Sequence, residues 1–239
     1  SGANRFEALR GIDLVVDEGE YVAIVGPSGS GKSTLMNLLG ALDVPTEGQY
    51  LLAGEDVALM GEEQLAVVRN RRIGFVFQQF HLLPTMPAWR NVALPLAYAQ
   101  VALAERRERA VAALERVGLG DKVDNLPGEL SGGQQQRVAV ARALVGEPSM
   151  LLADEPTGNL DSASTRDVLG LLDDLHAEGR TIVLITHEET VAGRADRVVV
   201  IRDGQIASDT AGVAGCTGRG RRPNRLQRVP CRNTGCGRR

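Results

Sequence analysis

Aromatic residues, cysteines and long apolar runs are all scarce in this chain. Aromatics make up only 3% of the 239 residues, which argues against an extended single-stranded nucleic-acid platform, because such platforms stack bases on aromatic faces. All three cysteines lie at or beyond Cys216, so nothing in the body indicates a disulfide-stapled secreted fold. No apolar run approaches the ~18–20 residues that span a bilayer. We therefore expect a soluble, cytosolic body, and 43% hydrophobic residues suffice for one large core.

The formal net charge of −3 hides a split between an acidic body and a basic tail. Residues 1–209 hold all 30 acidic residues and 19 of the 27 lysines and arginines, a formal charge of −11, whereas the rest of the chain holds eight arginines and no acid. An acidic body argues against nucleic-acid binding by the whole protein. We expect the tail, residues 209–239, to be disordered or translated from an altered reading frame. Contact with anionic surfaces and a three-cysteine zinc site are the alternatives.

Strand-like and helix-like segments alternate along the body. Short, continuous apolar runs suit strands buried on both faces of a parallel sheet. Such runs occupy residues 21–25, 73–77, 150–153 and 181–186. An amphipathic stripe predicts a helix through residues 168–175, and residues 198–202 and 205–207 flank Asp203-Gly204, a hairpin signal. The pattern predicts an α/β fold with a parallel-sheet core and an antiparallel β region.

Residues 84–146 differ from the rest because no strand pattern interrupts them. Residues 103–117 and 134–145 both show helical spacing of apolar side chains. We therefore predict a single domain over residues 1–208. Its core comprises residues 1–83 and 147–208, and residues 84–146 form an inserted helical subdomain.

A glycine-rich segment after the first strand fits the phosphate-binding loop G-x-x-x-x-G-K-[ST]. Its backbone N–H groups and the following helix N-terminus favour phosphate oxygens. Lys32, one of only two lysines in the chain, would reach the β and γ phosphates, and the Ser33 hydroxyl would hold Mg²⁺. The alternative is a Gly-rich turn, whose chance match to this pattern is on the order of 1%. The predicted loop comprises Gly26, Pro27, Ser28, Gly29, Ser30, Gly31, Lys32, Ser33 and Thr34.

Two carboxylates end the strand that begins at Met150. Asp154 would complete the Mg²⁺ shell, and Glu155 would orient or deprotonate the attacking water. Further upstream, Ser131-Gly132-Gly133-Gln134 opens a helix with a serine at the N-cap, which is physically a second anion-binding helix start. Taken alone, the carboxylates would suit a solvated loop, and the Ser-Gly-Gly segment an ordinary capped helix.

Together these motifs resemble the nucleotide-binding subunit of an ATP-binding cassette (ABC) transporter. Ser131-Gly132-Gly133-Gln134 matches the signature of that family, Asn159-Leu160-Asp161 its D-loop, Gln78 its Q-loop glutamine and His187 its switch histidine. The resemblance covers residues 8–207. Within the family, the pattern is most similar to the lipoprotein-release and macrolide-export type ATPase subunits. We expect His81 and His176 to be surface or packing residues.

The resemblance implies a P-loop NTPase (RecA-like) core that works as a homodimer around two ATP molecules. Lys32, Glu155, Gln78 and His187 would be catalytic, Gln78 would join the Mg²⁺ ligands, and the signature and Asp161 would contact the nucleotide across the dimer. It also implies a separately encoded transmembrane permease, docked near residues 78–91, and a peripheral position on the cytoplasmic face of the plasma membrane. ATP hydrolysis would then drive export or extraction. No nucleic-acid partner is expected.

Alternatives and departures remain. A cassette could regulate a cell-envelope enzyme through a membrane partner without transport. A DNA-maintenance ATPase is disfavoured, because only about 100 residues without sustained heptads separate loop and signature. Translation factors of the same superfamily carry two cassettes in one chain, whereas this sequence carries one, so that class is disfavoured as well. Family members also carry an early strand and an aromatic residue that stacks on adenine. The only early aromatic residue here is Phe6, which suits a core position better than the stacking role. We therefore expect a chain shortened at its N-terminus and ATP binding weakened by about 1–2 kcal/mol.

Overall fold

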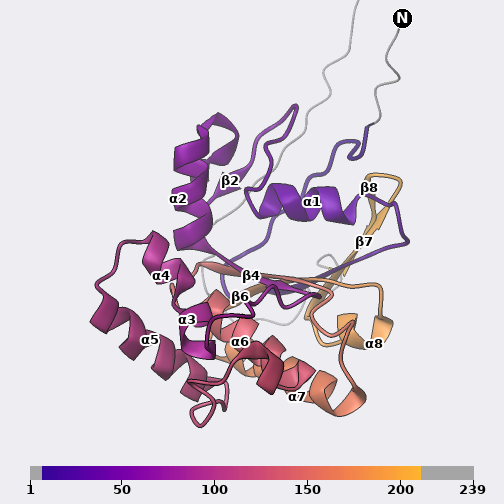
Figure 1. The fold of residues 1–239 in the computed structure, drawn as a ribbon. Helices are drawn as coiled ribbons and strands as arrows, with labels where there is room; N and C mark the ends of the chain where they lie inside the picture. The colour runs from indigo at the N-terminus through magenta and orange to yellow at the C-terminus, as the bar shows by residue number, and fades with distance from the viewer. Residues whose placement is uncertain (1–6, 211–239) are drawn as a thin grey trace, which may run out of the picture.

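The computed structural model describes residues 7–210, so the expectations about Phe6 and the tail beyond Thr210 lie outside the described residues. A six-stranded sheet forms the centre, in the order β4-β5-β6-β1-β7-β8 (Figure 1). Every neighbouring pair is parallel except β7 and β8, which form an antiparallel hairpin. The strands are β1 (Tyr21–Val25), β4 (Ile73–Phe77), β5 (Met150–Asp154), β6 (Thr181–Ile185), β7 (Arg197–Arg202) and β8 (Gln205–Asp209).

Helices cover both faces of this sheet. Figure 1 shows α1 on one side and α6 and α7 on the other. Of the described residues, none lies in a helix long and apolar enough to cross a membrane. The helices are α1 (Lys32–Leu39), α2 (Glu62–Arg72), α3 (Ala88–Val92), α4 (Leu94–Tyr98), α5 (Leu103–Arg116), α6 (Gly132–Leu144), α7 (Ser162–Ala177) and α8 (Glu189–Ala192). Two short strands, β2 (Leu51–Leu52) and β3 (Glu55–Asp56), pair separately, and 3-10 turns occupy Val57–Leu59 and Pro127–Glu129.

Strand β5 shows why the central strands read as continuous apolar runs. Leu151 and Ala153 belong to the core that α6 and α7 cover, whereas Met150 and Leu152 belong to the core on the α1 side. Both faces are therefore buried, which requires an apolar residue at every position. The predicted α/β fold is confirmed, and the central strands begin and end within one residue of their predicted bounds.

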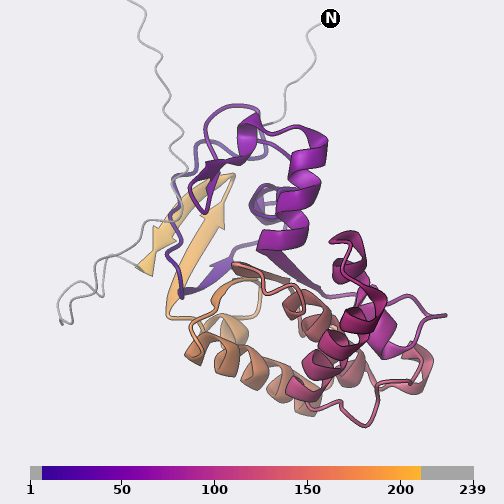
Figure 2. The same ribbon diagram turned by 90° about the vertical axis from the view of Figure 1, so that its left-hand side faces the viewer.

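Helices α3 to α6 gather beside the β4 edge of the sheet, with no strand among them (Figure 2). Helix α6 packs on β4, and α3 and α5 pack in turn on α6. Because β1, β4, β5 and β6 run parallel, their carboxyl ends meet at one edge of the sheet. In open α/β sheets this edge is where ligands bind.

Candidate nucleotide-binding site

A cavity of about 630 Å³ opens at the carboxyl ends of β1, β5 and β6. It brings together the predicted loop, the two carboxylates after β5 and His187 after β6. Ala8 and Ile185 also line it, and nothing in the local sequence pattern singled them out. The lining residues are Ala8, Gly26, Pro27, Ser28, Gly29, Gly31, Lys32, Ser33, Thr34, Asp154, Glu155, Ile185 and His187.

Close backbone approach explains two of the loop glycines. A Cβ at Gly26 would lie 2.2 Å from the carbonyl oxygen of Ile201, and one at Gly31 would lie 2.8 Å from that of Ala8. Gly31 also has a φ of +104°, which side chains rarely adopt. It caps α1 without any side-chain hydrogen bond, and no acidic residue lies in the first turn of that helix. Because no side chain caps the first N–H groups of α1, these groups and the helix dipole favour an anion at this end.

Lys32 lies across the mouth of the loop. Its Nζ donates to the carbonyl oxygens of Gly26 and Pro27, each at 2.8 Å. No ion pair between Lys32 and a carboxylate is found within residues 7–210, although Asp154 is near enough to be affected by its charge. Its protein partners are therefore neutral carbonyl groups, which leave the positive charge uncompensated and free to attract a phosphate ligand.

Asp154 ends β5 within the same cavity. Burial, and secondarily the neighbouring charge of Glu155, raise the pKa of this carboxyl group, while Lys32 partly offsets the rise. Asp154 and Ser33 offer the oxygen donors that Mg²⁺ prefers, and a cation beside them would relieve the penalty on the buried carboxylate. Within the described range, no group of three or more His, Cys, Asp or Glu side chains could hold a metal. The residues thus fit an ion that takes its other ligands from nucleotide phosphates and water.

Glu155 and His187 form a pair 32 residues apart in sequence, with 2.6 Å between Oε1 and Nδ1. Glu155 is held in place by its backbone N–H, which donates to the Ile185 carbonyl at 2.8 Å, and it adopts a φ of +46°. The hydrogen bond and the charge of Glu155 raise the pKa of His187. The His187 side chain is 64% exposed and that of Glu155 is 20% exposed, so the carboxylate sits deeper in the cavity wall.

Gln78 does not line this cavity. Its side-chain amide donates to Asn159 Oδ1 at 3.5 Å, and Asn159 in turn donates to the Gln78 carbonyl at 3.1 Å. A Cβ at Gly158 would lie 2.7 Å from Gln78 Nε2, which shows how closely the two segments approach. The segment after β4 is thereby tied to the segment after β5.

The Ser-Gly-Gly segment and Asp161 also lie outside this cavity. Ser131 and Gln134 form a capping box at the start of α6, with bonds of 3.3 Å and 2.9 Å. Asp161 caps α7, and the hydrogen bonds from Ser164 and Ala163 lower the pKa of its carboxyl group. The two helices begin side by side, since a Cβ at Gly133 would lie 2.4 Å from Ser164 Oγ.

The two remaining histidines pack as expected. His176 lies edge-on to the Tyr21 ring, with centroids 5.5 Å apart, and its Nε2 is 3.0 Å from the Gly19 carbonyl oxygen. His81 lies edge-on to Phe77. Neither lines the nucleotide cavity.

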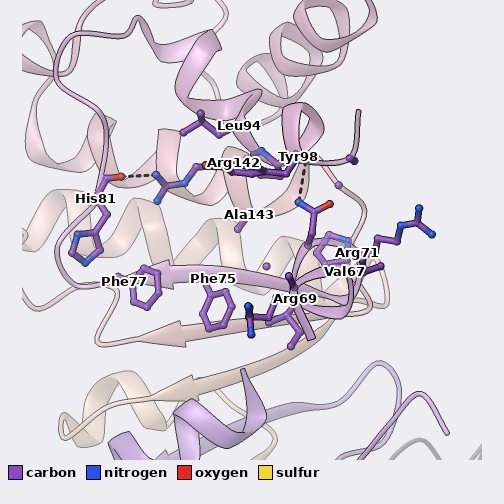
Figure 3. Close-up of a pocket in the computed structure, with 18 of the residues that line it drawn as sticks. Val67, Arg69, Arg71, Phe75, Phe77, His81, Leu94, Tyr98, Arg142 and Ala143 are labelled. Atoms are coloured by element: carbon purple, nitrogen blue, oxygen red, sulfur yellow. Dashed lines mark hydrogen bonds between the residues drawn. The ribbon is translucent and has the colours of Figure 1, made fainter. Parts of the chain in front are cut away.

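A second hollow, of about 910 Å³, lies between α2, β4, α4 and the end of α6 (Figure 3). Apolar side chains such as Phe75, Val67 and Leu94 line it together with Arg69, Arg71 and Arg142, and no Asp or Glu takes part. Phe77 and His81 come from the neighbourhood where a partner was expected. Helices α2 and α4 contribute much of the rest, which the sequence did not indicate. We call this hollow the arginine groove.

Comparisons with known proteins identify the family of this chain. Residues 9–158 match the family model described as ABC transporter. The chain is 54% identical over 211 residues to the uncharacterized ABC transporter ATP-binding protein YknY of Bacillus subtilis, covering 88% of this chain and 92% of that protein. It is 56% identical over 210 residues to the macrolide export ATP-binding/permease protein MacB of Hyphomonas neptunium, covering 88% of this chain. It spans only 33% of that protein's length.

A solved relative has the same fold. The post-hydrolysis dimer of the ATP-binding cassette MJ0796, bound to ADP and Pi, superposes with a TM-score of 0.77 at 42% identity. The match covers 84% of this chain and 89% of that one. The predicted P-loop NTPase architecture, ATP binding and ATPase activity are thereby confirmed. The chain belongs to the ABC transporter family, as one of its ATP-hydrolysing cassettes.

Proposed function

We propose that this chain dimerises around ATP and that its ATP hydrolysis drives a membrane permease in export or extraction. The observation that carries the proposal is the single cavity that gathers Lys32, Asp154, Glu155 and His187 at the ends of the parallel strands. Relatives named for macrolide export and pyoverdine export, each an ATP-binding/permease protein, support the direction of transport. The chain spans about a third of the length of those relatives, so the permease would be a separate protein or a further part of a longer one.

Each residue of the cavity would have a role that its geometry suits. The loop N–H groups and Lys32 would bind the phosphates. Ser33 and Asp154 would hold Mg²⁺, and this ion would neutralise charge on the phosphate oxygens. Gln78, whose side chain lies against Asn159 outside the cavity, would have to turn toward the ion to join its ligands. Glu155 would orient the attacking water and accept its proton. His187, which Glu155 holds by its Nδ1, would present its other ring nitrogen to the γ-phosphate.

A second copy of the chain would complete the site. The start of α6, with Ser131 at its cap, and Asp161 both lie outside the cavity of their own chain, and Ser131 and Asp161 are exposed. A helix N-terminus without acidic residues in its first turn favours an anion, and ATP supplies about four negative charges. The dimeric MJ0796 cassettes support this arrangement. Hydrolysis would remove the γ-phosphate that holds the two copies together.

The arginine groove would receive the permease. Arg142 donates to the carbonyls of Phe80 and His81, at 2.9 Å and 2.6 Å, and forms no ion pair within residues 7–210. Burial lowers the pKa of this guanidinium, which a carboxylate partner would reverse. An apolar groove with arginines and no acid, on a body of net negative charge, suits an amphipathic permease segment that carries acidic side chains. Through that contact the cassette would sit at the cytoplasmic face of the membrane.

Glu155→Gln tests the catalytic part of the proposal. The variant should bind ATP with unchanged affinity, lose at least about 100-fold in turnover and accumulate as an ATP-bound dimer in size-exclusion chromatography. Glu108→Gln, the same change at an exposed position on α5, is the control and should behave as wild type. Turnover by Glu155→Gln near the control rate would refute the role of Glu155.

Charge reversal in the arginine groove tests whether the permease binds there. The chain would be co-expressed with the membrane protein encoded beside it, and the pair purified in detergent. Arg71→Glu should abolish co-purification while ATPase activity is retained, because Arg71 lines the groove and not the nucleotide cavity. Arg180→Glu, directly before β6 and outside the groove, is the control. Undiminished co-purification of Arg71→Glu would place the permease elsewhere.

A further inference from the structure

Gln136, on the second turn of α6, makes contacts that neither the ATPase reaction nor the dimer has accounted for. Its side chain is 0% exposed. Its amide nitrogen donates to two backbone carbonyls, that of Phe77 at 3.2 Å and that of Pro156 at 2.6 Å. Its Oε1 atom is buried without a hydrogen-bond partner among the described residues.

The two carbonyls belong to the segments that carry predicted catalytic residues. Phe77 directly precedes Gln78, and Pro156 directly follows Glu155. The ladder between β4 and β5 ends where Phe77 meets Asp154, so the sheet no longer fixes the two segments beyond that point. The Gln136 amide joins them there, and it joins both to the helix that begins at Ser131.

Because Gln136 Oε1 has no hydrogen-bond partner among the described residues, the use of an amide at this position lies in its NH₂ donors. A buried carbonyl oxygen without a partner costs free energy, and an apolar side chain of similar size would avoid that cost. Carbonyl oxygens only accept hydrogen bonds, so an amide NH₂ group, with two protons, can serve Phe77 and Pro156 at once. A methionine would fill about the same volume but would remove the donor from both carbonyls.

We propose that Gln136 is a positioning residue for ATP hydrolysis, acting through the backbone on Gln78 and Glu155. The inference rests on the proposed roles of those two residues. The amide holds the segments after β4 and β5 at fixed positions relative to the start of α6. A displacement of that helix start, as a second copy binds ATP against it, therefore carries the Phe77 and Pro156 carbonyls with it. Gln136 does not itself line the nucleotide cavity.

The test compares Gln136→Met with Gln135→Met in the full chain. Gln135 is the matched control because it is the adjacent glutamine on α6, and within residues 7–210 its side-chain amide donates to the Leu130 carbonyl alone, at 3.1 Å. For Gln136→Met we expect kcat to fall about tenfold, with KM for ATP and the affinity for a non-hydrolysable ATP analogue within twofold of the control. Gln135→Met should retain wild-type kcat. This split between kcat and KM separates positioning from a general loss of structure.

Gln136→Glu provides a second variant of nearly the same shape. An ionised carboxylate donates to neither carbonyl and a protonated carboxyl group to only one, so kcat should fall here as well. The proposal is overturned if either variant that binds ATP normally keeps kcat within twofold of the control. It is also overturned if both variants lose ATP binding, since that outcome indicates a general structural role. Glu155→Gln, run in parallel, keeps the two hypotheses apart: wild-type turnover there refutes the catalytic assignment rather than the positioning role.

Discussion

Gly26→Ala should destabilise the nucleotide-free protein far more than Gly29→Ala, although both glycines belong to the phosphate loop. Val25 lies opposite Val200 in the parallel pair of β1 and β7, so Gly26 comes directly beside Ile201. A Cβ at Gly26 would lie 2.2 Å from the Ile201 carbonyl oxygen, whereas one at Gly29 would meet nothing within 4 Å. Ile201 also pairs with Ile206 in the hairpin, so its carbonyl cannot turn away freely.

The expected difference can be worked from these contacts. Both substitutions reduce the conformational freedom of the unfolded chain, which stabilises by about 0.4–1 kcal/mol. At Gly29, with a φ of +78°, the strain of a left-handed alanine costs about 1 kcal/mol and nearly cancels that gain. At Gly26 an overlap with fixed backbone adds about 1–3 kcal/mol. We therefore expect Gly26→Ala to be less stable than Gly29→Ala by about 2 kcal/mol.

Urea unfolding without nucleotide measures this difference. At a slope of about 2 kcal/mol per M, the midpoint of Gly26→Ala should lie about 1 M below that of Gly29→Ala. Equal slopes would show that the two denatured states are comparable. Midpoints within about 0.2 M of each other would refute the reasoning, because the close approach of the loop to β7 would then not constrain the side chain.

Three further predictions concern the cavity. Lys32→Ala should weaken ATP binding at least about 100-fold in calorimetry, because the ammonium group is a principal phosphate contact; unchanged affinity would contradict the loop assignment. Asp154→Asn should raise the melting temperature of the nucleotide-free protein at pH 7.5 while abolishing hydrolysis. The raised pKa of Asp154 means that the stability it contributes is lost as pH rises from the ordinary aspartate pKa through the raised one, and the neutral amide escapes that loss. Glu155→Gln should lower the pKa of His187 toward its ordinary value in an NMR titration, since Glu155 favours the protonated ring and that stabilisation disappears as pH rises through the raised pKa. An unchanged titration would show that the pair does not form in solution.

Local patterns predicted the elements well where the deciding contacts lie within a few residues. The run Ile73–Phe77 forms β4 with its predicted bounds, because a strand buried on both faces must be apolar throughout. The helical spacing of apolar side chains over residues 103–117 forms α5 as Leu103–Arg116. The prediction of a phosphate loop is equally local, since its glycines, lysine and hydroxyls are consecutive in sequence.

Local sequence patterns could not predict the contacts between segments that are distant in the chain. The sequence indicated Gln78 as a nucleotide-site residue, but the fold places its side chain against Asn159 and outside the cavity. Gln134, Gln135 and Gln136 are identical residues in a row, yet Gln134 caps the helix, Gln135 is half-buried and Gln136 is a buried bridge between two segments. Their positions on the turns of α6 differ by 100° steps, and only packing against β4 shows which one faces inward.

The sequence by itself determined which chemical groups this protein carries: a loop with the phosphate-binding pattern, two carboxylates at a strand end, a capped helix start and an acidic body. Each depends on residues next to one another in the chain. Only the tertiary structure decided which of these groups meet. The order β4-β5-β6-β1-β7 brings Glu155 to His187, and the packing of α6 on β4 brings Arg142 into one groove with Arg69. Strand order depends on long crossover connections, whose paths no pattern within a few residues encodes.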